Sequence, residues 1–218
     1  MVDKSVHPTS RVNAYVLAQA EPPTAAQAEL AETTAALGSV AEMQVPHDQA
    51  VFLTLLAQSV HAARVVEIGT FTGYSTLALA RGLRPGGVVD TYDVTDRWHT
   101  IAAGAWADAG VAHRVRQHVG PALDALRALP HAADIDLAFI DADKTGYVGY
   151  WEELVPRMRP GGVILADNTL YAGEAAEDEP VGNGLAIKRF NAHVLADDRV
   201  ESVLLTIGDG LTFARRTA

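Results

Sequence analysis

The sequence predicts a doubly wound α/β fold with a mostly parallel sheet. From residue 64 onward, short apolar runs alternate with longer helical stretches. Strands that alternate with helices are joined by right-handed crossovers, which give parallel strands covered by helices on both faces. The expected strands are 64–68, 88–92, 114–119, 136–140, 163–166, 200–205 and 211–214. The expected helices between them are 74–81, 96–108, 122–129, 147–158 and 185–195.

The first 60 residues are expected to form a helical cover. Residues 29–43 are rich in good helix formers, and Pro46 precedes a second helical segment, 48–60, whose apolar residues are spaced as on one helix face. The length suits one domain. We therefore interpret residues 1–60 as a cap and residues 61–218 as the α/β core of a single domain that spans the whole chain.

Turn residues support this arrangement. Pro85-Gly86-Gly87 and Pro160-Gly161-Gly162 each stand just before an expected strand, where a helix must stop and the chain must turn. Gly208-Asp209-Gly210 separates the last two strands and predicts a hairpin. The full prediction is a Rossmann-like, seven-stranded, mostly parallel sheet with an antiparallel edge strand. Such sheets bind ligands at the carboxyl ends of their strands.

Composition excludes several classes of protein. With 27 acidic and 17 basic residues the net charge is about −10, which argues against a nucleic-acid binder. The absence of cysteine excludes disulfides, thiolate zinc sites and a cysteine nucleophile. No apolar run approaches the roughly 20 residues of a membrane span. Residues 1–10 lack the apolar core of a signal peptide, so we expect a cytoplasmic protein.

The first strand leads into a glycine loop. Glu67-x-Gly69-x-x-x-Gly73 differs from the G-x-G-x-x-G of dinucleotide sites. The glycines permit backbone conformations and close approaches that a β-carbon would block. An acid before the first glycine suits a cationic or amine-bearing cofactor better than a pyrophosphate. The alternative is a tight turn in which Glu67 only caps a neighbouring group.

The next two strands end in residues that suit a nucleoside. Asp93 ends the second strand, where an acid can accept hydrogen bonds from both ribose hydroxyls. Its alternative role is a helix cap. Gly120-Pro121-Ala122 closes the third strand with small residues that could lie against a flat adenine.

Oxygen-bearing side chains follow the fourth and fifth strands. Asp141, Asp167 and Asn168 can converge there, because the ends of adjacent parallel strands meet at one edge. Three hard oxygen ligands suit Mg²⁺, or Mn²⁺ and Ca²⁺, better than Zn²⁺. The alternative is that these residues only end buried strands and cap turns.

Lys144 is the candidate catalytic base. It is one of only three lysines and lies three residues beyond Asp141. A partly desolvated lysine beside a divalent cation can be neutral and accept a phenol proton. The alternative for a loop lysine is simple exposure to solvent.

At this point the chain resembles the class I S-adenosylmethionine-dependent methyltransferases, and more narrowly the cation-dependent O-methyltransferases of the catechol and caffeoyl-CoA type. The resemblance is carried by four motifs in family order. They are EIGTFTGYS at 67–75, FIDADK at 139–144, LADNTL at 165–170 and IGDGL at 207–211. It implies direct methyl transfer from S-adenosylmethionine to a hydroxyl of a small aromatic diol, Lys144 as general base, and a homodimer.

The resemblance also implies a role for each matching residue. The cofactor-binding positions are Met43, Glu67, Gly69, Thr70, Ser75, Asp93, Val94, Ala122 and Asp141. The metal ligands are Asp141, Asp167 and Asn168, and the substrate contacts are Asp143, Lys144, Asn168 and Tyr171.

The loop after the fifth expected strand indicates the kind of acceptor. Tyr171 stands where the family often has tryptophan, and residues 174–180 carry four acids. Those acids would repel the phosphates of coenzyme A, which favours a small free catechol, such as a natural-product or amino-aromatic intermediate, over a caffeoyl-CoA-type thioester. The alternative for this loop is a solvated surface segment.

The residues disfavour two other classes of function. A nicotinamide oxidoreductase is disfavoured because G-x-G-x-x-G and a Tyr-x-x-x-Lys pair are missing. A non-catalytic binding module is disfavoured because Asp141, Lys144, Asp167 and Asn168 are all intact.

Overall fold

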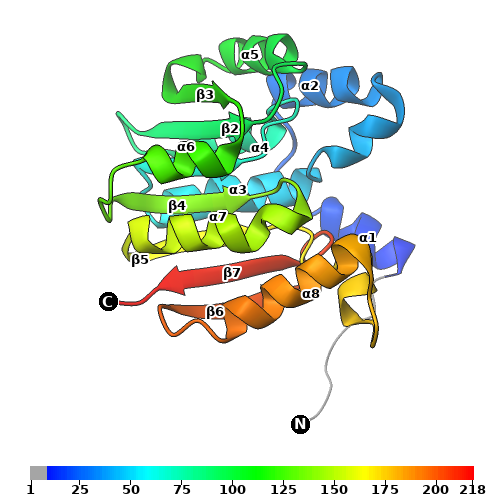
Figure 1. The fold of residues 1–218 in the computed structure, drawn as a ribbon. Coiled ribbons are helices and arrows are strands. Elements are labelled where there is room, and N and C mark those ends of the chain that lie inside the picture. The colour runs from blue at the N-terminus through cyan, green and yellow to red at the C-terminus, as the bar shows by residue number, and fades with distance from the viewer. Residues whose placement is uncertain (1–8) are drawn as a thin grey trace.

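A seven-stranded sheet forms the centre of the computed structural model, which describes residues 9–218 (Figure 1). The strands are β1 (Arg64–Ile68), β2 (Val88–Asp93), β3 (Val115–Val119), β4 (Ile135–Ile140), β5 (Met158–Ala166), β6 (Val200–Leu205) and β7 (Leu211–Arg216). Their order is β3-β2-β1-β4-β5-β7-β6, and all pairs are parallel except those of β7 with β5 and β6. The predicted fold class is confirmed, with the reversed strand β7 next to the edge strand β6.

Helices cover both faces of the sheet. They are α1 (Ser10–Leu17), α2 (Ala25–Ala35), α3 (His47–Ser59), α4 (Tyr74–Gly82), α5 (His99–Asp108), α6 (Ala122–Ala128), α7 (Tyr147–Leu154) and α8 (Gly182–Leu195), with short 3₁₀ turns η1 (Gly38–Met43), η2 (Ala112–Arg114), η3 (Lys144–Gly146), η4 (Val155–Arg157) and η5 (Glu174–Ala176). Side chains from α2 to α5 pack with Val65 and Leu137 on one face. Those from α6 to α8, in front of the sheet in Figure 1, pack with Val66 and Ala138 on the other. Successive strand residues therefore enter opposite cores.

The start of β5 differs from the prediction. The strand begins at Met158 rather than at residue 163, so the Pro-Gly-Gly sequence lies inside it. Pairing with β4 shifts register between Ile135 and Leu137, and Gly161 has a left-handed φ of 76°. Proline lacks an N–H and glycine tolerates this backbone, so these residues form an irregular segment within the strand instead of a preceding turn.

The N-terminal cover is helical, as predicted, but residues 29–43 do not form one helix. The helix α2 ends at Ala35, and Gly38, with a φ of 80°, begins η1. A residue in left-handed backbone ends the regular helical hydrogen bonding. The cover is therefore divided, and η1 is free to approach the carboxyl edge of the sheet.

Within residues 9–218, each helix is either too short or too polar to cross a membrane. The prediction about a signal peptide concerns residues 1–10, and residues 1–8 lie outside the described part of the chain.

Candidate active site

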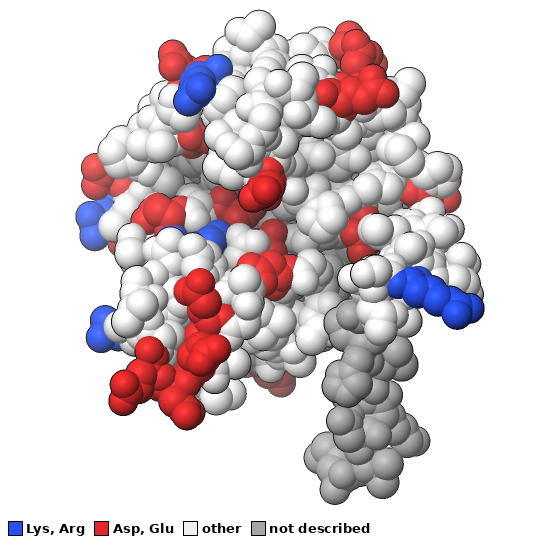
Figure 2. Space-filling view, turned by 90° about the vertical axis from the view of Figure 1, so that its right-hand side faces the viewer, with Lys and Arg blue, Asp and Glu red and all other residues white. Residues whose placement is uncertain are grey.

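The carboxyl ends of the parallel strands open onto a large cavity. Its volume is about 1160 Å³, and its walls include the segments that follow β1, β2, β3, β4 and β5, together with η1 and the turn between β6 and β7. Figure 2 looks onto this edge of the molecule and shows a hollow with acidic side chains around it. The cavity extends across β1 and β4, where the strand order reverses and where doubly wound sheets bind ligands.

Two glycines shape the loop between β1 and α4. Gly69 and Gly73 have left-handed φ values of 101° and 84°. A β-carbon on Gly69 would lie 1.8 Å from the carbonyl oxygen of Asp141, and one on Gly73 would lie 2.8 Å from the Trp106 indole. The close approaches predicted for this pair are therefore confirmed, and they bring the loop against the end of β4.

Asp93, at the end of β2, holds the same loop. Its Oδ2 accepts hydrogen bonds from the backbone N–H groups of Thr70 (3.2 Å) and Phe71 (2.9 Å), and its Oδ1 accepts one from Thr95 (3.1 Å). Asp93 is only partly buried and lines the cavity. A carboxylate can accept about four hydrogen bonds, so capacity is left for a ligand. The proposed contact with ribose hydroxyls stays a prediction.

Glu67 lies behind the loop rather than in the cavity wall. It is fully buried and accepts hydrogen bonds from the hydroxyls of Thr76 and, at 2.7 Å, Thr91, whereas Oε1 has no partner among the described residues. Burial raises the pKa of Glu67 to about 7, against the lowering effect of hydrogen bonds from Ser75, Thr76 and Thr91. Its predicted contact with the cofactor is not visible in the lining of the cavity and stays a prediction.

The ends of β4 and β5 bring Lys144 between two predicted metal ligands. Lys144 Nζ donates to Asp141 Oδ1 at 3.1 Å and to Asn168 Oδ1 at 2.5 Å. Asn168 has a left-handed φ of 54°, which turns the chain away from the direction of β5. Asp167 beside it is 2% exposed. Two of the three predicted metal ligands thus contact the same lysine nitrogen.

The donors in this cluster fit a hard divalent cation. Burial and the charge of Asp141 raise the pKa of Asp167, against hydrogen bonds from Asn168 and Gln49 and the attraction of Lys144. A buried carboxylate whose pKa is raised by a neighbouring carboxylate is stabilised in its charged form by a cation. Within residues 9–218, no three His, Cys, Asp or Glu side chains are placed to hold a metal together, so a site built on Asp141 and Asp167 would need the amide oxygen of Asn168 as its third protein ligand.

Two buried residues of this cluster were not predicted. Tyr147, at the start of α7, accepts a hydrogen bond from Lys144 Nζ (2.7 Å) and donates one to the Asp167 carbonyl (3.1 Å). Gln49, on α3, donates from Nε2 to Asp167 Oδ2 (2.6 Å). One signal could have found Gln49. It lies one turn before Leu53 on the buried stripe of α3, where a polar side chain needs a partner.

The loop after β5 forms the wall near the predicted acceptor position. Tyr171 and Ala172 have left-handed φ values of 50° and 52°. Asn183 of α8 donates to the Tyr171 hydroxyl (2.8 Å), and the Ala172 N–H donates to Asp209 Oδ1 (2.7 Å). The Tyr171 hydroxyl is therefore held from α8, and the backbone beside it is held from the turn between β6 and β7, while Tyr171 lines the cavity.

Apart from Glu67, the structure places every predicted site residue in the wall of this one cavity. They are Met43, Gly69, Thr70, Ser75, Asp93, Val94, Ala122, Asp141, Asp143, Lys144, Asp167, Asn168 and Tyr171. The residues predicted for the cofactor lie in η1 or at or after the ends of β1, β2 and β3, except Asp141, which follows β4 and is also a predicted metal ligand. The other residues predicted for the metal and the acceptor follow β4 and β5. A donor and an acceptor could therefore meet in a single enclosure.

Comparisons with known proteins identify the family to which this chain belongs. The O-methyltransferase family matches residues 18–217. The chain belongs to this family. Caffeoyl-CoA O-methyltransferase 2 of Zea mays is 36% identical over 185 residues, which cover 80% of this chain and 70% of that protein. Tricin synthase 1 of Oryza sativa subsp. japonica is 38% identical over 188 residues, which cover 80% of this chain and 75% of that protein.

Solved O-methyltransferases share the fold. TomG of Streptomyces achromogenes, in complex with S-adenosylmethionine, superposes with a TM-score of 0.86 at 32% identity and covers 95% of this chain and 96% of its own. The Bacillus cereus O-methyltransferase, in complex with SAH, gives 0.83 at 33% identity, with 95% and 97% covered. The protein is thus an S-adenosylmethionine-dependent O-methyltransferase, and the oxidoreductase and binding-module alternatives are set aside.

Proposed function

We propose that this O-methyltransferase requires a divalent cation, most simply Mg²⁺, with Mn²⁺ or Ca²⁺ as substitutes, and methylates a hydroxyl of a small catechol. The observation that carries the proposal is the position of Lys144 Nζ, within hydrogen-bond distance of both Asp141 Oδ1 and Asn168 Oδ1. An all-oxygen cluster beside a lysine and inside a large cavity suits a cation and an ionisable acceptor.

The residues divide the work of the transfer. Asp141, Asp167 and Asn168 would hold the cation, which when bound lowers the pKa of the acceptor hydroxyl. Lys144 Nζ accepts the hydroxyl proton, so that an O–C bond forms as the S–C bond of the methyl donor breaks. Asp93, Thr70, Ser75 and their neighbours hold the donor. The contribution of the chain is mainly alignment of the two reactants and exclusion of water.

A small free catechol is the acceptor we favour. Acids line the cavity, and residues 174–180 add four more beside α8. This charge disfavours the phosphates of coenzyme A. TomG is involved in tomaymycin synthesis, which supports a natural-product intermediate as acceptor. The alternative is a thioester-linked catechol, which the name of the Zea mays relative supports.

The test is methylation of a catechol panel by the purified chain with S-adenosylmethionine, with and without EDTA. We expect methylated product from vicinal diols, loss of turnover with EDTA, and recovery on adding Mg²⁺. Turnover that survives complete metal removal would refute the cation requirement. A clear preference for caffeoyl-CoA over every free catechol would instead select the alternative acceptor.

A homodimer and a cytoplasmic location are also proposed. The dimer follows from the family resemblance, and α1 adds an apolar surface, since Tyr15, Val16 and Leu17 are about half exposed or more. Light scattering of the purified chain tests it: a mass near twice 23.1 kDa is expected, and a monomer at micromolar concentration would contradict it.

A further inference from the structure

Gln49 is a buried polar side chain that reaches the oxygen cluster from α3. It is 1% exposed, and its Nε2 donates to Asp167 Oδ2 at 2.6 Å across 118 residues of sequence. The other contacts of the Asp167 carboxylate are local, since Oδ1 accepts the N–H of the next residue, Asn168, at 2.7 Å. Gln49 is therefore the long-range contact that sets how this carboxylate is rotated.

The orientation of the Gln49 amide leaves one of its polar atoms without a hydrogen bond among the described residues. The amide nitrogen of Gln49 faces Asp167, where it donates to the carboxylate oxygen Oδ2. The amide oxygen Oε1 then points elsewhere, and it has no partner among the described residues. A buried unpaired oxygen is destabilising. The contact with Asp167 explains a glutamine at this position better than packing does, because an apolar side chain would fill the same space without a buried unpaired oxygen.

The surrounding backbone keeps the amide in place. Gly208, in the turn between β6 and β7, lies against it, because a β-carbon there would be 2.5 Å from Gln49 Oε1. From the opposite face of the sheet, Tyr147 donates to the carbonyl oxygen of Asp167. The side chain of Asp167 is thus fixed from α3 and its backbone from α7.

We infer that Gln49 is a positioning residue that orients the Asp167 carboxylate for binding the divalent cation. It acts through Asp167 and is not itself a ligand. This inference rests on the proposed function, because it needs a cation at Asp141, Asp167 and Asn168. Residues that hydrogen-bond a ligand from behind typically change metal affinity about 10- to 100-fold when they are replaced.

The test measures Mn²⁺ binding by the full-length chain, using the electron paramagnetic resonance signal of free Mn²⁺ together with titration calorimetry. The variants are Gln49→Leu, which removes the donor, and Gln49→Asn, which stays polar but is one methylene shorter. The matched control is Thr54→Val. Thr54 lies on the same helix and bonds only the backbone oxygens of Ala50 and Ala78, away from the cavity.

We expect both Gln49 variants to raise the Kd for Mn²⁺ about 10- to 100-fold. Their affinity for S-adenosylhomocysteine should equal that of wild type, and excess Mn²⁺ should restore their turnover. Thr54→Val should bind Mn²⁺ like wild type. If a folded Gln49 variant keeps wild-type Mn²⁺ affinity, or if Thr54→Val weakens binding equally, the inference is overturned and the proposed function stands. If wild type binds no Mn²⁺, both this inference and the cation requirement fail. Should Gln49→Leu not fold, Gln49→Asn decides.

Discussion

Glu67 shows how a single buried carboxylate couples the glycine loop to pH. Its pKa is raised from 4.5 to about 7 because burial removes it from water. The folded protein therefore holds a proton that the unfolded chain releases above about pH 4.5. The stability due to this proton is complete below the unfolded pKa and is lost as the pH rises through the folded pKa. The shift sets an upper limit of about 3 kcal/mol.

We accordingly expect the ligand-free protein to lose thermal stability between about pH 5 and about pH 8. In Glu67→Gln the decline should be smaller, because the side chain no longer ionises. Glu177→Gln, on an exposed loop, should keep the wild-type slope. Thermal unfolding followed by circular dichroism across this range measures the effect. A Glu67→Gln slope identical to wild type would show that Glu67 does not titrate there.

Lys144 should control turnover and not cofactor affinity. Its Nζ contacts Asp141, Asn168 and Tyr147. Lys144→Met should lower kcat about 10²- to 10⁴-fold, the usual contribution of a general base. The Kd for S-adenosylhomocysteine, measured by calorimetry, should not change. Lys188→Met is the matched control, because Lys188 lies outside the cavity wall and donates to the backbone oxygens of Glu177 and Asp178. Unchanged kcat in Lys144→Met would remove it as the base.

Most site residues that the sequence predicts lie at or near strand ends, whereas the ones it misses lie on helices. Asp93, Asp141 and Asn168 each stand at the end of a strand or just beyond it, and the ends of neighbouring parallel strands lie at one edge of the sheet. Gln49 comes from a helix far away in sequence, and its meeting with Asp167 depends on how α3 packs on the sheet. Periodicity indicates which face of α3 is buried but not which residue of a distant strand it touches.

At the scale of elements, prediction succeeded where the hydrophobic pattern changes sharply. The strands β1 and β6 have their predicted bounds, since turn residues flank each apolar run. The strand β5 starts earlier because Met158 pairs with Ile135 of β4, and the Pro-Gly-Gly segment between Met158 and Val163 is accommodated as an irregularity in the strand. Local propensity predicts a turn there, and tertiary pairing overrides it.

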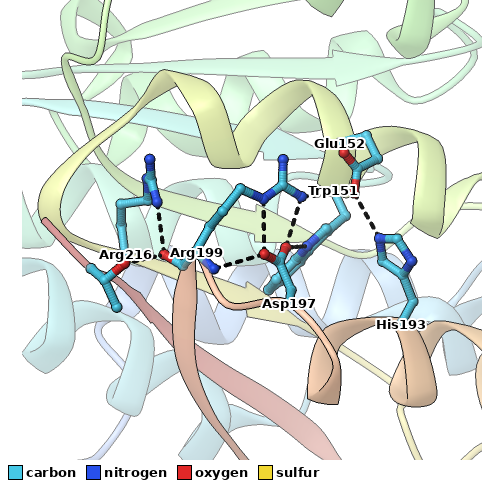
Figure 3. Close-up of polar contacts among 7 residues, drawn as sticks. Trp151, Glu152, His193, Asp197, Arg199 and Arg216 are labelled. Carbon is cyan, nitrogen blue, oxygen red and sulfur yellow. Dashed lines mark hydrogen bonds and ion pairs between the residues drawn. The ribbon is translucent and has the colours of Figure 1, made fainter.

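The connection between α8 and β6 is held by an ion-pair network (Figure 3). Arg199 donates to both carboxylate oxygens of Asp197 (2.8 and 2.7 Å) and to Glu152 (2.7 Å), and Trp151 donates to Asp197 (2.8 Å). The hydrogen bonds from Arg199 hold the pKa of Asp197 well below its usual range. The network therefore ties α7 to the turn that precedes the edge strand.

Arg199→Ala should lower the free energy of unfolding by about 1–2 kcal/mol. Hydrogen bonds to charged groups contribute more than this, but Arg199 is 35% exposed and solvent screens part of the effect. Because the pKa of Asp197 is lowered on folding, the difference from wild type should shrink as the pH falls below about 4. Urea unfolding at several pH values measures the loss of stability and its dependence on pH.

Arg215→Ala, which breaks an exposed 3.5 Å pair with Glu201, should lower the free energy of unfolding by about 0.5 kcal/mol or less. Equal losses in the two variants would contradict this account.

At the scale of the whole molecule, part of the net negative charge lies in the wall of the cavity. The described residues that line the cavity include one lysine, Lys144, and six acids, namely Glu42, Asp93, Asp141, Asp143, Asp167 and Asp209. Figure 2 shows acidic side chains around the same hollow. The net charge of −10 that first excluded nucleic acid is therefore concentrated in part where the acceptor must enter. Charge focused in a cleft selects ligands of the opposite sign.

The acceptor should accordingly be chosen by charge. At low ionic strength we expect kcat/KM for an aminoethyl-substituted catechol to exceed that for a carboxyethyl-substituted catechol of the same length by about tenfold. The two share the diol, so chemistry at the reacting oxygen is matched, and the ratio should approach one as salt screens the field. Initial rates across a salt series measure it. A ratio near one at low salt, or one that does not respond to salt, would mean that contacts other than the acidic wall select the acceptor.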